Sequence, residues 1–406
     1  MKSCAGGFGA RVRNTRAAHR IAWAGALTLT LALGACNTGP TGHINREINL
    51  PATLGTQSIF VTVSLGQQVQ NPGETLALNA QTGAPRWKTA TGGTGGTPAV
   101  VGGAVYLATE DGSIWALDAA SGKPRWSFTR SAGVGSQYGF DGYATVSGVN
   151  VFVSSDGGAV YALDISTGRQ RWVRTWPHAG DTIYAAPAVD AGLVFVPVGG
   201  PDGGGYALNA ATGAIVWQVS HVEGFDALPL VANGVVYFAS QAPGTLVALD
   251  EKSGAPRWQT GSSGVNAAPV TDGNLIIVAG ADEIVRAYHV QDGSPSWTFQ
   301  TGGAAGNALI PTGAALTLSG GTLYAGSQGG VVYALSATTG KQLWSTATNS
   351  PIDSPPAVAN GAIYAATESG KIFAFRASDG AMAWTYIAGP NALITSGPVV
   401  ASASGR

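Results

Sequence analysis

Short runs in which apolar residues alternate with small or polar ones fill most of the chain, and glycine-rich turns separate these runs. Ser113–Asp118 is one such run, and its pattern is typical of a half-buried strand. A complete unit consists of Thr97–Val101, Val105–Thr109, Ser113–Asp118 and Lys123–Phe128. These four runs predict four consecutive strands, which we name A, B, C and D in chain order.

One pattern recurs along the chain: an aromatic or aliphatic residue, Ala, Leu, Asp or Asn, two or three spacers, Gly, three more residues and Trp, as in Tyr161–Trp172. There are eight copies, of which those at Arg286–Trp297 and Phe373–Trp384 are looser. The closing tryptophans are Trp87, Trp126, Trp172, Trp217, Trp258, Trp297, Trp344 and Trp384. They follow one another at steps of 39, 46, 45, 41, 39, 47 and 40 residues. A repeat of roughly 40–50 residues with four short strands is typical of a propeller blade. We therefore predict an all-β, eight-bladed β-propeller of four-stranded antiparallel blades.

Each recurring position has a physical role. The Ala two residues before the acid, such as Ala162 before Asp164, is small in all copies, which indicates that a large group lies against it, most simply the Trp of its own or an adjacent blade. The Asp or Asn accepts hydrogen bonds from the amides of the following turn. The Gly supplies the positive φ that a tight hairpin needs. These glycines are Gly83, Gly122, Gly168, Gly213, Gly254, Gly293, Gly340 and Gly380.

The first blade lacks a strand A. Ile59–Val63 predicts its strand B and Leu76–Trp87 its strands C and D, with no further run ahead of them. Near the other end of the chain, Ser396–Val400 resembles Thr97–Val101. We expect this C-terminal strand to join the first blade, because ring closure removes open sheet edges.

The A-x-D-x-x-T-G-x-x-x-W pattern resembles the tryptophan-docking repeat of quinoprotein-type (PQQ-like) propellers. The resemblance spans almost all of the chain after residue 55. It implies the propeller fold. The repeat takes its name from the cofactor pyrroloquinoline quinone (PQQ), but its residues build the scaffold and do not bind the quinone.

The N-terminal residues have the features of an export signal. Five basic residues and no acid precede an apolar run, Ile21–Leu33, which is short of the ~20 residues that span a bilayer as a helix. Leu33–Cys36 then resembles the lipobox of bacterial lipoproteins, which implies cleavage before Cys36 and its lipidation. The alternative is an ordinary secretory signal with a chance cysteine.

These features suggest three segments. We expect a lipoprotein signal peptide at 1–35, a lipidated Cys36 with a polar tether at 36–56, and the propeller at 57–406. The residue after Cys36, Asn37, is not the Asp that resembles inner-membrane retention signals in enteric bacteria, which favours the outer membrane. Only Cys4 and Cys36 are cysteines, so the mature chain has no disulfide.

Composition narrows the function classes. Only 11% of the residues are charged, the net charge is -1, and no basic run follows residue 20. These values argue against nucleic acid as a partner.

The resemblance also implies where a ligand site would lie. In propellers of this family the residues just before strand A line the mouth of the central channel. Here these are Asp141 or Tyr143, Tyr184, Asp226, Asn266, Asp353 and Thr395. Converging carboxylates and amides can hold a cation or a polar ligand, and the alternative is that they cap turns or bind channel water.

Quinoprotein dehydrogenases typically have an adjacent cysteine pair and a calcium site beside the quinone. The mature chain has no cysteine pair and no Cys-x-x-Cys-His motif, and no calcium trio is marked in the sequence. We therefore expect no cofactor and no catalytic residue, with PQQ and calcium as the alternative. The mature histidines, His43, His178, His221 and His289, have no zinc spacing, so no metal site is expected.

Two surface features bear on partners. Long connections at Ser131–Gly142, Arg174–Thr182 and Gly302–Gly313 are places where a ligand or partner is often met, or they are tolerated insertions. Arg86, Arg125, Arg171 and Arg257 recur beside the Trp of strand D, either as a partner-binding rim or as solvated charges that prevent edge pairing.

Domain type, size and lipid anchor resemble the BamB-type lipoproteins of the outer-membrane protein assembly machinery. This resemblance implies a non-catalytic scaffold that binds envelope or outer-membrane proteins and touches the membrane only through its lipid. It would reside on the outer membrane facing the periplasm, or on the outer face of the cell membrane. The alternatives are a PQQ-dependent dehydrogenase oxidising alcohols or sugars, and a ligand-sensing propeller.

Overall fold

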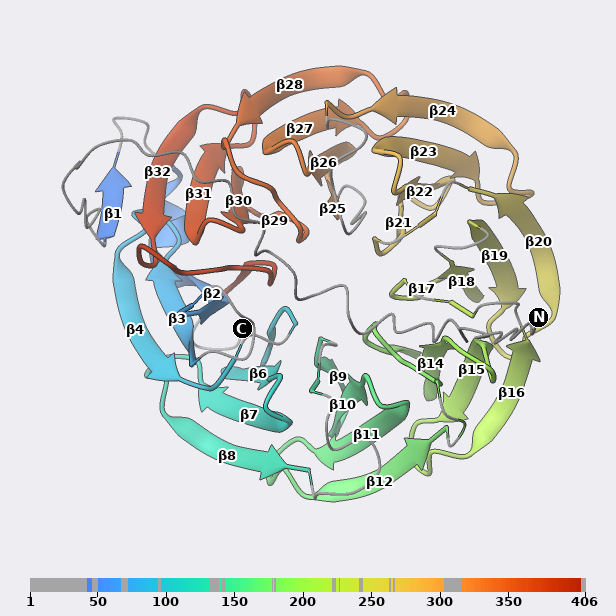
Figure 1. Ribbon diagram of the computed structural model, residues 1–406. Coiled ribbons are helices and arrows are strands. Elements are labelled where there is room, and N and C mark those ends of the chain that lie inside the picture. Colours follow the sequence, from blue (N-terminus) through green and yellow to red (C-terminus); the bar gives the residue numbers. More distant parts are fainter. Residues whose placement is uncertain are drawn as a thin grey trace, which may run out of the picture.

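Eight antiparallel sheets, seven of four strands and one of five, form a closed ring in the computed structural model (Figure 1), which confirms the predicted propeller of eight four-stranded blades. The structure describes residues 42–45 and 50–402, except 67–71, 94–95, 131–138, 141–142, 177, 179, 221–223, 226, 241–243, 263, 266 and 303–314. The expected signal peptide and Cys36 lie outside the described residues. Within them, no helix has the length and apolar character needed to cross a membrane.

Each blade contains strands A to D from the ring centre outward. Blade 1 consists of β33 (Val399–Ser402), β2 (Gln57–Ser64), β3 (Gly73–Asn79) and β4 (Pro85–Ala90), and blade 2 of β5 (Ala99–Val101), β6 (Ala104–Ala108), β7 (Ser113–Asp118) and β8 (Pro124–Thr129). Blade 3 consists of β9 (Thr145–Ser147), β10 (Asn150–Ser155), β11 (Ala159–Asp164) and β12 (Gln170–Thr175), and blade 4 of β13 (Ala188–Asp190), β14 (Leu193–Val198), β15 (Gly204–Asn209) and β16 (Ile215–Ser220).

The second half of the ring repeats this order. Blade 5 consists of β17 (Leu230–Ala232), β18 (Val235–Ala239), β19 (Thr245–Asp250) and β20 (Pro256–Gly261), and blade 6 of β21 (Val270–Thr271), β22 (Leu275–Ala279), β23 (Ile284–His289) and β24 (Pro295–Gln300). Blade 7 consists of β25 (Ala315–Ser319), β26 (Thr322–Gly326), β27 (Val331–Ser336) and β28 (Gln342–Ala347), and blade 8 of β29 (Ala357–Ala359), β30 (Ala362–Thr367), β31 (Lys371–Arg376) and β32 (Met382–Ile387).

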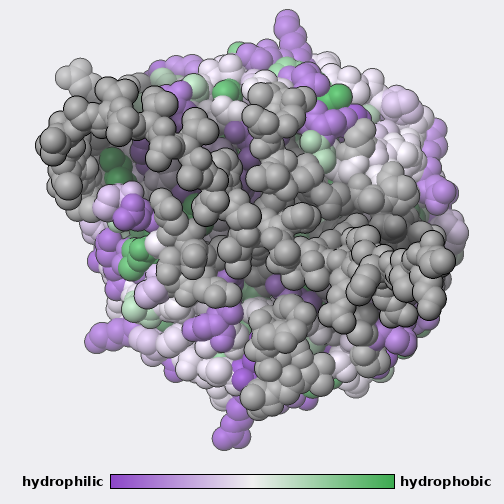
Figure 2. All heavy atoms as spheres, viewed as in Figure 1, coloured by the Kyte–Doolittle hydropathy of each residue, from purple (hydrophilic) through white to green (hydrophobic). Residues whose placement is uncertain are grey.

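The hydrophobic core lies between the blades. Strands B and C supply most of the buried residues, and strand β6 is buried at every position. Strand D forms the rim and is exposed at alternate positions, as in β8. The visible side of the molecule in Figure 2 accordingly has mainly hydrophilic or neutral side chains at its edge, with hydrophobic ones in isolated spots.

The Trp of each repeat lies between its own blade and the next. Trp87 is paired across the sheet with Ala77, and the same Ala–Trp pairing occurs in all eight blades. The large neighbour expected beside this Ala is therefore the Trp of the same blade. The other side of the Trp87 ring covers Gly122 of the next blade, where an added Cβ would lie 2.6 Å from the ring. Its Nε1 donates to the Ala119 carbonyl at 3.0 Å.

The ring closes between the two ends of the chain. Strand β33 pairs with β2, with Val399 opposite Phe60, which confirms the expected closure. The Trp384 ring covers Gly83 of blade 1, as in the other blade contacts.

Part of the segment that we interpret as a tether lies against the propeller. Strand β1 (Gly42–Asn45) pairs with β32 as a fifth strand, and a 3-10 helix, η2 (Ala52–Thr56), precedes β2. Leu50 belongs to the core cluster of blades 8 and 1. Strand β32 is more buried than the other D strands, with Trp384 and Ala383 fully buried.

Candidate functional site

The connections of the propeller are divided between two faces. Because strands alternate in direction, the D–A connections and B–C turns converge on one face, which we call the D–A face. The A–B and C–D turns lie on the other, the C–D face. All residues expected at the channel mouth belong to D–A connections.

The two faces differ in charge. Among the described residues, the connections of the C–D face carry four acids and four bases, which balance. Those of the D–A face carry nine acids and a single base, Arg130. The acids are Glu110, Asp111, Asp156, Asp181, Asp202, Asp282, Glu283, Asp353 and Glu368. The pKa of Glu368 is raised to about 8, so this acid is largely neutral at pH 7, and the other eight acids give the face a negative field that favours cationic ligands or basic partners.

The channel mouth itself is mostly apolar. A cavity of about 420 Å³ opens there, and it is lined by Thr97, Pro98, Tyr143, Ala144, Thr145, Leu228, Ala268, Thr317, Pro355, Pro356, Gly397 and Pro398. Its hydroxyl groups connect neighbouring blades: Thr145 Oγ1 donates to the Pro187 carbonyl, and Thr317 Oγ1 to the Pro356 carbonyl, both at 2.7 Å. No carboxylate is among these lining residues.

The residues expected as funnel ligands do not converge in the described part of the chain. Tyr184 is 49% exposed, and Asp353 forms a hydrogen bond with Gln328 Nε2; neither lines the cavity. Tyr143 does line it, and burial raises its pKa. Thr395 is described and does not line the cavity, whereas Asp141, Asp226 and Asn266 lie outside the described residues.

Asp353 instead belongs to an acidic cluster between blades 6 and 8. Glu368 of the β30–β31 turn forms a hydrogen bond with Asp353, and this bond together with burial raises the pKa of Glu368 to about 8. Glu283 is also buried and accepts a hydrogen bond from Thr301 Oγ1 at 2.7 Å. Burial raises the pKa of Glu283 as well. Because the pKa of Glu368 is about 8, the carboxyl group of Glu368 holds a proton near neutral pH.

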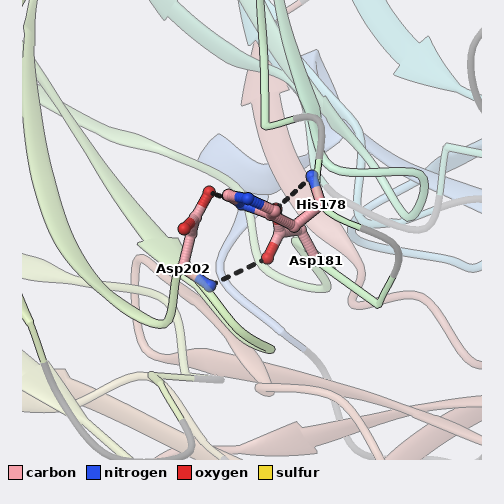
Figure 3. Close-up of side chains that lie close together, drawn as sticks. All are labelled: His178, Asp181 and Asp202. Atoms are coloured by element: carbon pink, nitrogen blue, oxygen red, sulfur yellow. Dashed lines mark hydrogen bonds and ion pairs between the residues drawn. The ribbon is translucent and has the colours of Figure 1, made fainter.

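A second cluster combines a histidine with two aspartates (Figure 3). His178 and Asp181 lie on the connection between β12 and β13, and Asp202 lies on the β14–β15 turn. His178 Nδ1 is 2.6 Å from Asp202 Oδ2 and 4.0 Å from Asp181 Oδ2. The hydrogen bond with Asp202 raises the pKa of His178.

Sequence reasoning missed this cluster. The spacing of histidines along the chain does not reveal it, because its three residues come from two connections of one face. The available signal was topological: Arg174–Thr182 is a D–A connection and 199–203 a B–C turn, so both lie on the D–A face.

The rim arginines are structural. Arg125 donates to Asp118 at 2.8 Å and Arg257 to Asp250 at 3.0 Å, and Arg171 pairs with Asp164. Hydrogen bonds from these arginines and from the turn hydroxyls lower the pKa of each aspartate to about 2. Blades 4 and 7 have Asn209 and Ser336 at this position of the turn, with Val216 and Leu343 in place of the Arg. Blade 1 keeps Arg86 although its turn residue is Asn79, and Arg86 donates to the Gly55 carbonyl instead. In blades 2, 3 and 5 the arginine therefore stabilises the turn of its own blade.

The sequence model of a protein family described as outer membrane protein assembly factor BamB matches residues 49–137, 133–220, 202–316 and 306–406. These stretches include strands of every blade. The chain belongs to this family. The resemblance to BamB-type propellers with PQQ-like repeats is thereby confirmed.

Individual relatives match parts of the chain. BamB of Escherichia coli is 32% identical over 112 residues, which are 25% of this chain and 28% of the relative. The serine/threonine-protein kinase AfsK of Streptomyces griseus is 34% identical over 175 residues, which are 40% of this chain and 21% of the kinase. The chain thus spans less than a third of the length of either relative.

Solved structures share the fold. BamB from Moraxella catarrhalis superposes with a TM-score of 0.60 at 21% identity, covering 85% of this chain and 98% of that one. A quinohemoprotein alcohol dehydrogenase from Pseudomonas putida has the same TM-score at 16% identity, covering 84% and 77%. At these identities the likeness establishes the fold alone.

Proposed function

We propose that this protein is a non-catalytic scaffold of the cell envelope that binds other proteins during outer-membrane protein assembly, as BamB-like propellers do. The family match along all eight blades carries the proposal. Lipidation at Cys36 would anchor the protein on the outer membrane facing the periplasm, because more than one acyl chain gives stable anchoring. No bound quinone is required for this function.

The D–A face is the proposed partner-binding surface. Its described connections carry nine acids and one base, whereas the charges of the C–D face balance. A basic segment of an envelope protein would be steered to the D–A face, because complementary charge raises association rates and selects partners.

Gene deletion tests the function. We expect the deletion strain to contain less folded β-barrel protein in its outer membrane, measured by the heat-dependent mobility of barrels on gels. A plasmid copy should restore the level, and Cys36→Ala should restore it poorly. Unchanged barrel levels would contradict the proposal. Calcium-dependent PQQ binding with dye-linked alcohol oxidation by the purified protein would favour a dehydrogenase instead.

Paired substitutions test the surface. Asp111→Asn with Asp156→Asn removes two charges from the D–A face, and Asp190→Asn with Asp272→Asn removes two from the C–D face. At ~0.5 kcal/mol per charge at the surface, the first pair should weaken partner binding about five-fold, measured with crosslinked envelope partners at low salt. Equal effects of both pairs would refute the choice of face.

A further inference from the structure

We propose that His178, Asp181 and Asp202 form a binding site for one divalent transition-metal ion of the zinc class. The three residues each offer one ligand atom, and these atoms all lie within 4.8 Å of one another. The site is independent of the scaffold function proposed above. Figure 3 shows the three side chains facing one another from two loops.

The distances suit a metal after small movements. Zinc bonds to nitrogen and carboxylate oxygen are ~2.0–2.2 Å, which places tetrahedral ligands ~3.4 Å apart. His178 Nδ1 must therefore move outward from Asp202 Oδ2, now at 2.6 Å, and closer to Asp181 Oδ2, now at 4.0 Å. Each of these movements is less than ~1 Å.

Asp181 is the fixed member of the site. Its side chain is fully buried. Oδ2 accepts the His178 amide and Oδ1 accepts the Asp202 amide, both at 3.0 Å. A carboxylate has about four lone-pair sites, so Asp181 can hold the backbone of both other ligands and still bind an ion.

The other two ligands can adjust. The His178 side chain is 63% exposed and that of Asp202 31% exposed, so rotation of either disturbs little packing. Metal at Nδ1 requires the neutral imidazole with its proton on Nε2, and any second proton leaves to solvent on binding.

Contacts outside the ligand set hold the two loops in register. Thr182 and Gly199 exchange backbone hydrogen bonds of 3.1 and 2.9 Å. Tyr206 donates its hydroxyl to the Asp202 carbonyl at 2.8 Å. Gly200 has φ of 96°, and a Cβ there would lie 2.2 Å from the Gly180 carbonyl oxygen. The loops meet closely only because glycine occupies this position.

The donor set selects the metal. One imidazole and two carboxylates suit Zn²⁺ and its first-row neighbours, whereas Mg²⁺ and Ca²⁺ prefer oxygen ligands alone. Three protein ligands also leave a fourth tetrahedral position for water.

Calorimetric titration of the untagged mature chain with ZnCl₂ tests the site. We expect one high-affinity ion per chain and no comparable binding of Mg²⁺ or Ca²⁺. His178→Gln and Asp202→Asn should each weaken the binding by more than about ten-fold, because loss of a ligand should exceed the 10–100-fold cost of altering its supporting partners. His289→Gln and Asp190→Asn, on the C–D face, should leave it unchanged.

Thermal unfolding separates binding from misfolding. In the absence of zinc, His178→Gln should unfold near the temperature of the native chain, and zinc should raise that temperature only for the native chain. A zinc-edge anomalous peak between the three side chains in soaked crystals would support the site. Absence of 1:1 binding, or equal binding by the His178 and Asp202 variants, would overturn it.

Discussion

Glu251 occupies a position of the repeat at which every other blade has an apolar residue. The equivalent residues are Ala80, Ala119, Ile165, Ala210, Val290, Ala337 and Ala377. Glu251 is only 4% exposed, and its Oε1 has no hydrogen-bond partner among the described residues. Burial, followed by the nearby Asp190, raises the pKa of this carboxyl. We therefore predict that Glu251→Ala stabilises the protein.

The size of the effect follows from two opposing contributions. An unsatisfied buried polar group costs about 1–3 kcal/mol. Alanine loses one buried methylene, which is worth about 0.8 kcal/mol. The net gain in the free energy of unfolding should be about 1 kcal/mol at neutral pH. The backbone contacts survive, because Trp217 Nε1 donates to the carbonyl of residue 251 at 3.0 Å whatever its side chain.

The gain should depend on pH with a definite sign. Because the pKa of Glu251 is raised above 4.5, the folded state binds its proton more tightly than the unfolded state. The penalty in the native protein is therefore absent below pH 4.5 and grows as pH rises through the folded pKa. The advantage of Glu251→Ala should shrink on acidification.

Urea unfolding followed by tryptophan fluorescence, from pH 4 to 8, measures this effect. The reciprocal change Ala337→Glu provides the matched control, and it should destabilise the interface of blades 6 and 7 most strongly at high pH. If Glu251→Ala lowers the free energy of unfolding at pH 7, the carboxyl has a favourable partner and the reasoning fails.

Three further predictions use the same assay. Truncation after Gly389 removes β33 and should lower the urea midpoint more than any single substitution, and an unchanged midpoint would contradict a role of β33 in ring closure. Gly122→Ala should cost more than about 2 kcal/mol, because φ is +71° and the new Cβ meets Trp87, whereas Gly102→Ala at φ +57° meets nothing within 4 Å and should cost about 1 kcal/mol. Equal costs would refute the role of the ring contact. Since the pKa of Glu368 is raised to about 8, the free energy of unfolding should fall between pH 4.5 and about 8 and then level off. Glu368→Gln should flatten this pH dependence. If the variant shows the same pH dependence as the native protein, another group causes it.

The fold could be predicted because each repeat contains the Ala, Gly and Trp positions that make the contacts within and between blades. Ala77 must be small since Trp87 lies opposite, and Gly122 must lack a Cβ since the other side of the same ring covers it. Eight copies of these positions at steady spacing predict the number of blades. The missing strand A of the first blade predicts that a C-terminal strand closes the ring. Such contacts recur with a fixed sequence offset, so a single chain reveals them without relatives.

The side-chain clusters of the D–A face could not be predicted in this way. His178 meets Asp202, 24 residues away, because a D–A connection and a B–C turn of the same face lie side by side. Asp353 was expected to face the channel, but it turns to Gln328 and Glu368 of the neighbouring turns. Connections differ in length and sequence from blade to blade. Their charged residues therefore do not pair at a constant sequence separation, and the sequence alone does not predict which of them meet.

The contact between blades 8 and 1, which we call the closure seam, differs from the other contacts between blades. In seven blades the repeat Trp donates its Nε1 to a carbonyl of the next blade. Between blades 8 and 1, Tyr364 instead donates its hydroxyl to the Ala80 carbonyl at 2.8 Å. Trp384 Nε1 has no hydrogen-bond partner among the described residues. Strand β1 pairs with β32 at this same place, with Asn45 opposite Trp384. The outer strand of blade 8 is correspondingly more buried than the other D strands. The seam joins segments more than 300 residues apart, so its loop-closure entropy is the largest in the ring, and an added strand together with a fully buried Trp offsets part of that cost.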